Sequence, residues 1–375
     1  MPVKKAAWYE VTSNDQLLTP CLLVYPEIIR RNLTETIRIA GSVERLRPHV
    51  KTHKTPQIVK LALEAGITKH KCATLLEASM LAECGVPDVL IAYPLVGPAI
   101  DKLVQLMAQF PRAQFRCTVD NPVSLNRLSA ALERCQRSID VLVDIDSGMH
   151  RTGIPAGEAA IALFAQIADT PNVTAGGLHI YDGQNHQPNE LERHAAVDAL
   201  MTPIREMVNE LRQRGLDVPR LVCGGTPTFP MYAALEDAGI ECSPGTCTLS
   251  DYNYGRNYTD MACIHPAAVL MARVISRCGP NQLTLDLGYK AVSGDQPAGR
   301  RCHVLNIPDA KEVGHSEEHL VIETIHASEF EPGDVIYALP AHVCPTVALH
   351  SHLQVIAGGE VVGSWPVTAR DRFYR

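Results

Sequence analysis

The sequence predicts an α/β protein in which a (β/α)8 barrel of the TIM type is followed by a mainly β domain. Over the first two-thirds of the 375 residues, short strand-like runs alternate with helical patterns. Eight strands, each followed by a helix or a return, are the number that a (β/α)8 barrel requires. After about residue 255 the helical periodicity fades and short β-type runs between turns replace it. A doubly wound sheet is the alternative, but no glycine-rich dinucleotide turn follows the first strand.

The barrel elements follow from apolar runs and from helix start and stop signals. Thr55-Pro56, Gly97-Pro98 and Asn121-Pro122 are typical helix starts. Strands are predicted at 46–52, 69–74, 88–93, 114–119, 140–146, 174–180, 220–225 and 240–245. Helices are predicted at 26–43, 55–66, 76–85, 97–110, 121–135, 155–169, 191–215 and 228–239.

The second domain is predicted from β-type runs that glycine-containing turns separate. These runs are Val269–Ile275, Gln282–Asp286, His319–Ile325, Asp334–Ala338, Leu353–Ala357 and Val361–Val367. We therefore expect a barrel at 22–255 and a β domain at 256–375, which residues 1–21 join.

Composition excludes several classes of function. A net charge of −7 gives no overall basic field that would favour nucleic acid. No run approaches the roughly 20 apolar residues that cross a membrane, and no apolar run follows the first lysines as in a secretory signal. The twelve cysteines are scattered without a C-x-x-C pair. Buried thiols in a reducing cytoplasm fit this pattern better than a disulfide framework.

The octapeptide RPHVKTHK at 47–54 lies where the first strand should turn into a helix. A run of charges is usually a solvated surface. A lysine held in a partly desolvated site, however, loses its proton and can form a Schiff base with a carbonyl cofactor. The remaining strand ends decide between the two interpretations, because the active site of such a barrel lies at the carboxyl ends of its strands.

Ionisable residues and glycines gather at those strand ends. They are Lys51, Thr74, Asp144, Asp146, His150, Arg151, His179, Tyr181 and Asp182, with the turns CGGTPT (223–228) and SPGTCT (243–248). Backbone amides approach an anion closely where side chains are absent, and threonine hydroxyls add donors. The loops after strands 7 and 8 are the usual phosphate site of these barrels. A lysine on strand 1 together with such a phosphate site predicts pyridoxal 5'-phosphate.

A second constellation is PAHVCP at 340–345. In an extended segment His342 and Cys344 would point to the same side. Imidazole and thiolate suit zinc, and two protein ligands would leave an open, catalytic site. His350 and His352 have the same spacing but are expected to be structural or surface residues.

These motifs together resemble the D-threonine aldolase and D-serine dehydratase family. The resemblance rests on RPHVKTHK, DIDSGMHRTG (144–153), GLHIYDGQNH (177–186), the two glycine turns and PAHVCPTV (340–347). It implies an alanine racemase-like barrel with a β domain, a homodimer, pyridoxal phosphate and a divalent metal, zinc or manganese. Carried over by position, the Schiff-base lysine is Lys51, and Arg151 approaches the phenolic oxygen of the cofactor. Tyr181 lies beside the cofactor, the phosphate residues are Gly224, Gly225, Thr226, Gly245 and Thr246, and the metal ligands are His342 and Cys344.

The resemblance implies cleavage of D-β-hydroxy-α-amino acids to glycine and an aldehyde. The metal would lower the pKa of the β-hydroxyl, and His186 or a metal-bound hydroxide would take its proton. Dehydration of a D-serine or D-hydroxyaspartate type of substrate uses the same lysine and metal. A racemase with Tyr289 as its second base, or a cofactor-binding protein without turnover, are more remote alternatives. The loop YDGQNH departs from that of many aldolases.

Overall fold

The computed structural model describes residues 7–372, which form two compact units. One unit holds the chain up to Leu33, Thr52–Ile58 and Thr246–Arg370, and the other holds Thr34–Lys51 and Val59–Gly245. Residues 1–6 and 373–375, which the sequence analysis assigns to the β domain, lie outside the described residues.

The second unit is built on a parallel sheet with the strand order β2-β3-β4-β5-β7-β8-β9, and the short β6 pairs with β5. Its strands are β2 (Lys69–Cys72), β3 (Asp88–Ile91), β4 (Gln114–Val119), β5 (Ile139–Asp146), β6 (Ile154–Pro155), β7 (Val173–Tyr181), β8 (Leu221–Cys223) and β9 (Ile240–Cys242). Leu90, Leu142 and Val222 form one buried cluster on three of these strands. Because all neighbouring pairs are parallel, their carboxyl ends meet at one rim.

The segment 46–49 closes this sheet between β9 and β2 without forming a strand. Leu46 bridges Cys242, and His49 bridges Lys71, both in parallel. The expected strand at 46–52 is thus wrong in its extent, since Val50–Thr52 is already a turn of 3-10 helix. Pro48 has no N–H to give to a ladder, and the chain must turn before the next helix begins at Pro56. The closed ring confirms the predicted barrel class.

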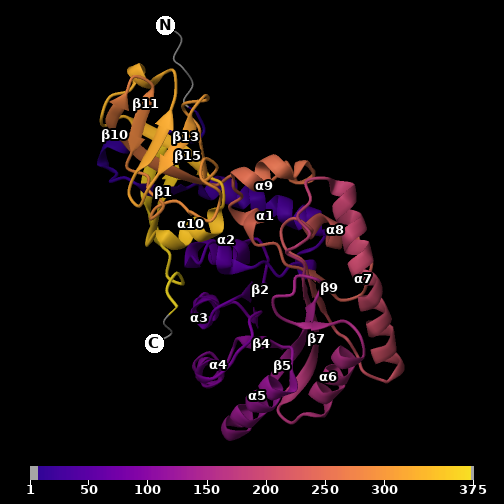
Figure 1. Cartoon of the computed structure of the whole chain (residues 1–375). Coiled ribbons are helices and arrows are strands. Elements are labelled where there is room, and N and C mark those ends of the chain that lie inside the picture. The colour runs from indigo at the N-terminus through magenta and orange to yellow at the C-terminus, as the bar shows by residue number, and fades with distance from the viewer. Residues whose placement is uncertain (1–6, 373–375) are drawn as a thin grey trace. The chain divides into compact units, whose positions relative to one another are not determined.

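Helices connect the barrel strands. Figure 1 shows α3 to α7 outside the strands, as a (β/α)8 barrel requires. The helices are α1 (Pro26–Ala40), α2 (Pro56–Glu64), α3 (Leu75–Glu83), α4 (Pro98–Gln109), α5 (Pro122–Cys135), α6 (Glu158–Asp169), α7 (Glu190–Gln213) and α8 (Phe229–Ala234). Prolines occupy the predicted first positions of α2, α4 and α5. Helix α8 is shorter than the predicted 228–239, because the backbone becomes extended at Leu235.

The start of α3 illustrates how local sequence fixes an element. The Thr74 hydroxyl accepts the N–H of Glu77 at 3.1 Å, and the Glu77 carboxylate accepts the N–H of Ala73 at 2.7 Å. A threonine followed three residues later by glutamate satisfies two amides that a helix start leaves unbonded. The helix therefore begins directly after β2 and leaves Lys71 on the strand.

The first unit is mainly β, with the path β13-β14-β11-β10-β1-β16-β17 and with β15 and β12 branching from β10. Its strands are β1 (Cys21–Val24), β10 (Ala268–Gly279), β11 (Gln282–Leu285), β12 (Cys302–Val304), β13 (Lys311–His315), β14 (Leu320–Glu323), β15 (Val335–Pro340), β16 (His352–Ala357) and β17 (Glu360–Pro366). Strand β1 pairs with β10 and β16, so the N-terminal segment joins this sheet. Its core includes Leu23, Met271 and Ile356.

Two short helices of this unit were not predicted from the sequence. They are α9 (Tyr252–Asn257) and α10 (Val343–Leu349). Asp251 links their starts, because its carboxylate accepts the N–H groups of Tyr254 at 2.9 Å and Val343 at 3.1 Å. One buried carboxylate therefore caps both helices.

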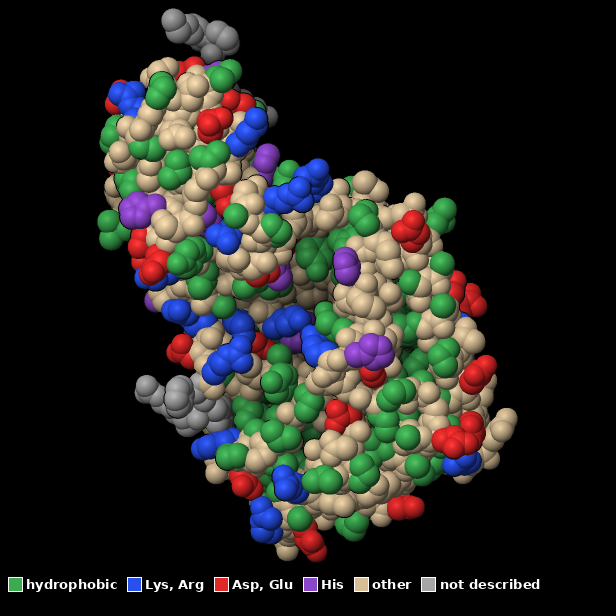
Figure 2. All heavy atoms as spheres, in the orientation of Figure 1, with side chains coloured by type: hydrophobic (Ala, Val, Ile, Leu, Met, Phe, Trp, Pro, Cys, Tyr) green, Lys and Arg blue, Asp and Glu red, His purple; other side chains and the backbone are tan. Residues whose placement is uncertain are grey.

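The visible surface carries charged side chains of both signs, in agreement with the composition. Acidic and basic side chains are interspersed with apolar ones over the helices α3 to α6 (Figure 2). Within residues 7–372, no helix is both long and apolar enough to span a bilayer. Cys117 and Cys223 are buried thiols, as the apolar runs around them predict.

Candidate active site

The turn that carries Lys51 is shaped by His49. The Nδ1 atom of His49 accepts the backbone N–H of Lys51 at 3.2 Å, and the His49 N–H donates to the Pro244 carbonyl at 3.0 Å. These bonds hold the turn at the end of the segment that closes the barrel. The Lys51 side chain is half-buried. His49 is therefore a structural residue of this turn.

In the first unit, the chain after Lys51 continues in a second turn. The Nδ1 atom of His53 accepts the N–H of Thr55 at 3.1 Å. Lys54 has a φ of 50°, which is left-handed backbone, and its ammonium group lies 3.5 Å from the Ala369 carbonyl. His53 and Lys54 thus serve the connection to α2, and the octapeptide is an ordered turn.

Three cations surround the ring of Tyr181, the last residue of β7. The Arg151 guanidinium lies 4.9 Å from the ring centroid, the Lys51 ammonium 5.6 Å and the Lys71 ammonium 5.8 Å. They come from the loop after β5, the turn 50–52 and β2. Positive charges gathered at one rim attract an anion. Pyridoxal phosphate, with its phosphate group and phenolic oxygen, would fit this charge, and the Lys51 amine is a group that could react with its aldehyde.

The turn after β8 approaches Tyr181 closely. A Cβ atom on Gly225 would lie 3.2 Å from the Tyr181 ring, and Gly224 has a φ of 72°. The Gly245 N–H donates to the Thr226 hydroxyl at 3.1 Å, which joins the turns after β8 and β9. Backbone amides without side chains in front of them suit a phosphate group. Thr246 begins the next turn of helix, Thr246–Thr248.

Asp182 holds the turn after β8 in place. Its carboxylate accepts hydrogen bonds from the hydroxyls of Thr228 at 2.9 Å and Tyr232 at 3.2 Å. The side chain is 1% exposed, and burial raises its pKa above the ordinary value although these hydrogen bonds oppose the rise. Asp182 is therefore a structural carboxylate that fixes the glycine turn beside Tyr181.

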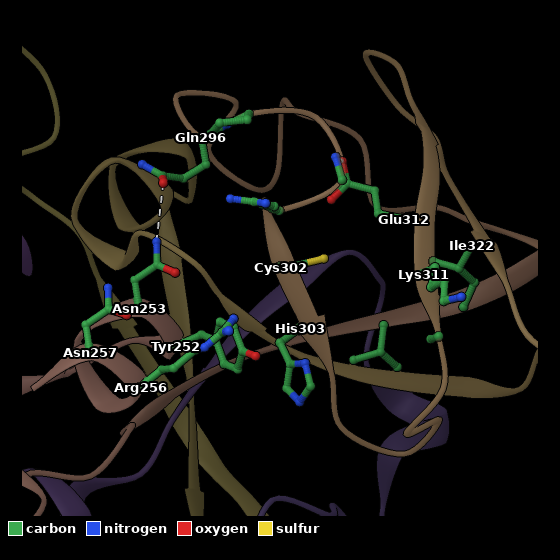
Figure 3. A pocket seen from close by; sticks show the side chains of 15 residues that line it. Tyr252, Asn253, Arg256, Asn257, Gln296, Cys302, His303, Lys311, Glu312 and Ile322 are labelled. Atoms are coloured by element: carbon green, nitrogen blue, oxygen red, sulfur yellow. Dashed lines mark hydrogen bonds between the residues drawn. The ribbon is translucent and has the colours of Figure 1, made fainter. Parts of the chain in front are cut away.

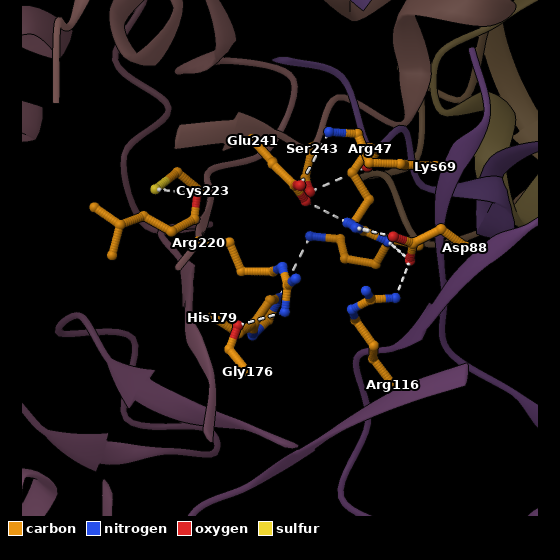
Figure 4. Close-up of polar contacts among 12 residues, drawn as sticks. Arg47, Lys69, Asp88, Arg116, Gly176, His179, Arg220, Cys223, Glu241 and Ser243 are labelled. Carbon is orange, nitrogen blue, oxygen red and sulfur yellow. Dashed lines mark hydrogen bonds and ion pairs between the residues drawn. The ribbon is translucent and has the colours of Figure 1, made fainter. Parts of the chain in front are cut away.

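A network of ion pairs lies inside the opposite end of the barrel (Figure 4). Arg47 is fully buried and bonds Glu241 at 2.5 Å and Asp88 at 2.6 and 3.1 Å. Lys69 also pairs with Glu241, and Arg116 pairs with Asp88. These pairs tie the closing segment to β9 and β3, so they fix the end of the chain segment that leads to Lys51.

The predicted metal residues lie at the start of α10 in the first unit. His342 is the N-cap and Cys344 is in the first turn, so the extended conformation expected for this segment is wrong. The helix nevertheless brings the two side chains into hydrogen-bonding contact. The Cys344 thiol also lies 3.2 Å from the Thr52 hydroxyl and 3.6 Å from the Thr246 hydroxyl.

The chemistry of this pair suits a metal. Burial opposes ionisation of Cys344, but the bonds to His342, Thr52 and Thr246 outweigh it and lower the pKa of the thiol. A thiolate and a neutral imidazole are the forms that bind zinc. Burial opposes protonation of His342, but Cys344 and Asp295 raise the pKa of the imidazole to about 9, so a metal would have to displace its proton. In the described part of the chain, no cluster of three or more His, Cys, Asp or Glu side chains could hold a metal. A metal held by His342 and Cys344 would thus have two protein ligands and open positions for water or substrate.

Three further histidines were considered in the sequence. His186 is exposed on the loop between β7 and α7. His350 is buried and lies 2.7 Å from the Ala291 carbonyl, and His352 is exposed, as expected for structural and surface histidines. Lys71 and Asp295 were missed. Lys71 follows the period-2 pattern of β2 into the barrel, which was the available signal.

A separate pocket of about 870 Å³ lies in the first unit between α9 and the strands β12 to β14 (Figure 3). The ring of His303 stacks on Tyr252 there with centroids 4.4 Å apart. None of the predicted site residues lines it. It is therefore distinct from both groups described above.

Comparison with known proteins covers nearly the whole chain. Residues 25–249 match the alanine racemase N-terminal domain family, and residues 267–356 match a putative serine dehydratase domain. A D-threonine aldolase of Arthrobacter sp is 31% identical over 333 residues, which are 87% of this chain and 85% of the relative. A D-threo-3-hydroxyaspartate dehydratase of Delftia sp. is 25% identical over 372 residues, 92% of this chain and 96% of the relative.

The comparison with solved structures agrees with these sequence matches. The crystal structure of D-threonine aldolase from Filomicrobium marinum superposes with a TM-score of 0.88 at 29% identity, covering 98% of this chain and 99% of that one. The similarity thus includes both the parallel barrel and the β unit.

Proposed function

Because the chain belongs to the family of D-threonine aldolases and D-serine dehydratases with an alanine racemase-like barrel, we propose that it is an aldolase for D-β-hydroxy-α-amino acids. It would cleave substrates such as D-threonine to glycine and an aldehyde with pyridoxal phosphate and a divalent metal. The observation that carries this proposal is the ring of three cations, Lys51, Lys71 and Arg151, around Tyr181 beside a glycine turn.

The cofactor half of the proposal assigns one role to each group. Lys51 would hold the cofactor covalently, and Arg151 would bond its phenolic oxygen while the Tyr181 ring packs beside it. The amides of Gly224, Gly225 and Gly245, with the hydroxyls of Thr226 and Thr246, would hold the phosphate. When bound, the cofactor ring accepts the electron pair that bond cleavage leaves at the α-carbon.

The metal half rests on His342 and Cys344. Their imidazole and thiolate would hold zinc or manganese, which supplies a Lewis acid for the β-hydroxyl of the substrate. Asp295 would fix the His342 ring, because the carboxylate accepts the Nδ1 proton at 2.6 Å and leaves Nε2 as the ligand atom. Removal of the β-hydroxyl proton would fall to a metal-bound hydroxide or to a histidine such as His186, which is exposed on the loop after β7.

Dehydration is the second candidate, and one observation favours it. Residues 267–356, which include the metal pair, match a putative serine dehydratase domain, and a dehydratase relative spans most of the chain. In that reaction Lys51 would remove the α-proton, and the metal would help the β-hydroxyl leave. The two reactions differ in what leaves the β-carbon, so their products separate them.

The test supplies the holoenzyme with D-threonine and with D-3-hydroxyaspartate, each with and without a chelator. Glycine with an aldehyde supports the aldolase, whereas a 2-oxo acid with ammonia identifies a dehydratase. Borohydride reduction followed by peptide mapping should place the cofactor on Lys51, and Lys51→Ala should abolish this label. Activity that survives complete metal removal would contradict the role of His342 and Cys344.

We also propose a cytoplasmic homodimer. The buried cysteines suit a reducing compartment, and the dimer is the expectation that the motif resemblance implies. Light scattering of the purified protein measures the mass directly, and a mass of 40.9 kDa would mean a monomer.

A further inference from the structure

Lys71 is a buried lysine that belongs to the cation ring around Tyr181 but has no assigned step in the reaction proposed above. It is 2% exposed and lies on β2 beside the segment that closes the barrel. The backbone N–H of Lys71 donates to the carbonyl of Pro48 at 2.9 Å, and Pro48 lies three residues before Lys51. A buried ammonium group is costly unless an acceptor satisfies it. The groups around Lys71 therefore indicate what it does.

A chain of hydrogen bonds runs from Lys71 to a carboxylate. The Lys71 ammonium lies 3.4 Å from Nε2 of His179, and Nδ1 of His179 lies 2.7 Å from Asp144. Thr152 donates its hydroxyl proton to the other Asp144 oxygen at 3.0 Å. Because the carboxylate takes the Nδ1 proton, Nε2 carries the lone pair and accepts from Lys71.

Burial and hydrogen bonding together set the protonation states of Asp144 and His179 in this series of hydrogen bonds. Burial opposes ionisation of Asp144, but its bonds to His179 and Thr152 hold the pKa of the carboxyl below its ordinary value. Burial, and then the positive charge of Lys71, lower the pKa of His179, so the imidazole is neutral. Lys71 with its proton thus balances the negative charge of Asp144 across one neutral ring.

The proton on Lys71 is held weakly. Burial, and then the charge of Lys51, lower the pKa of the Lys71 ammonium to about 7. The charges of Asp144 and Asp182 act in the opposite direction. The groups that face Lys71 are Lys51 from the turn 50–52, Asp144 from β5, His179 and Tyr181 from β7, Asp182 from the loop after it and Cys223 from β8.

We propose that Lys71 is a second ionisable lysine of the cofactor site, and that its charge, balanced through His179 and Asp144, sets how strongly the cofactor on Lys51 holds its proton. The inference rests on the proposed binding of pyridoxal phosphate to Lys51. Lys51 and Lys71 approach the same ring, so their charges oppose each other. A positive Lys71 disfavours a proton on the Lys51–cofactor linkage, and a neutral Lys71 permits it.

The test is a pH titration of the visible absorbance of the holoenzyme, with no substrate present. Lys71→Met removes the charge at similar volume, and we expect the midpoint to rise by on the order of one pH unit. Lys71→Arg keeps the charge at every pH, so its midpoint should lie at or below that of the wild type. Lys69→Met is the matched control, because Lys69 lies on the same strand but pairs with Glu241.

The outcomes separate this inference from the proposed function. A Lys71→Met midpoint equal to that of the wild type, or a Lys71→Arg midpoint above it, would overturn the role of Lys71. If circular dichroism shows that Lys71→Met does not fold, the direction of the Lys71→Arg shift decides alone. Borohydride labelling of Lys51 in all variants supports the covalent anchor, whereas a label on Lys71 would overturn both the anchor and the inference.

Discussion

The Nδ1 atom of His342 lies 2.6 Å from a carboxylate oxygen of Asp295. The two residues are 47 positions apart, and Ser293 holds the same carboxylate with its hydroxyl at 2.6 Å. A carboxylate behind a histidine fixes which nitrogen carries the proton and how the ring is oriented. In the proposed metal site, this contact would leave Nε2 of His342 as the ligand atom beside the Cys344 thiol.

Replacing Asp295 tests whether its contact with His342 supports metal binding. Asp295→Asn keeps the size of the side chain but removes the charge that fixes the His342 tautomer. We expect the affinity for zinc or manganese to fall about 10- to 100-fold. Calorimetric titration of the metal-stripped protein measures this, and Asp309→Asn is the control, because Asp309 bonds Thr324 elsewhere in the same unit. Equal affinity in the wild type and Asp295→Asn would argue against the site.

The contact between Gly225 and Tyr181 gives a prediction about the cofactor. In Gly225→Ala the new Cβ would lie 3.2 Å from the Tyr181 ring, so the ring or the turn must shift. We expect the dissociation constant of pyridoxal phosphate to rise about tenfold, since a shift costs on the order of 1 kcal/mol. Gly255→Ala has nothing within 4 Å of its Cβ and should bind as the wild type does. Fluorescence titration of the apoprotein with the cofactor measures both.

The barrel was predictable because its signals are local. Apolar runs marked β4 and β5, and prolines at the first position marked α4 and α5 within a residue or two. The segment 46–52 was not predictable as a closing turn, because its two bridges depend on residues far along the chain, Cys242 and Lys71. Tertiary pairing, which leaves no periodic trace, decided it.

The residues of the candidate site likewise divide into those that have a local sequence signal and those that have none. Tyr181 was predicted at a strand end, as was Lys51, which lies instead in a 3-10 turn, and motif resemblance suggested Arg151. Lys71 also lies in a strand, but it was not predicted as a site residue because lysine side chains usually face solvent. Asp295 has no local signal, because its partner His342 lies on another element. His342 and Cys344 were paired on the expectation of an extended segment, whereas the segment begins a helix.

The buried Arg47 should be essential to the stability of the barrel. Arg47→Met would leave Asp88 and Glu241 without their main cation, and breaking one partner of a buried ion pair costs about 3–5 kcal/mol. The comparison is Arg134→Met, whose pair with Asp101 is exposed and should be worth less than about 1 kcal/mol. Urea unfolding followed by circular dichroism measures both changes. Similar losses in the two variants would contradict the assigned role of the network.

The acid stability of the protein should depend on His70, which is 2% exposed on β2. Its Nε2 lies 3.2 Å from the Ile67 carbonyl, and Nδ1 has no hydrogen-bond partner among the described residues. Burial lowers its pKa from the ordinary 6.5 to about 4. Below 6.5 the unfolded chain therefore takes up a proton that the folded protein refuses, and stability is lost as the pH falls toward 4.

His70→Gln removes this titration while keeping a donor for the Ile67 carbonyl. Between about pH 7 and about pH 5, the wild type should lose on the order of 2 kcal/mol more unfolding free energy than the variant. Urea unfolding at several pH values measures the two curves, and only their difference reports on this residue, because other groups titrate in both proteins. Parallel curves would mean that His70 is protonated in the folded barrel. The cost of its burial would then have to be met by an acceptor at Nδ1.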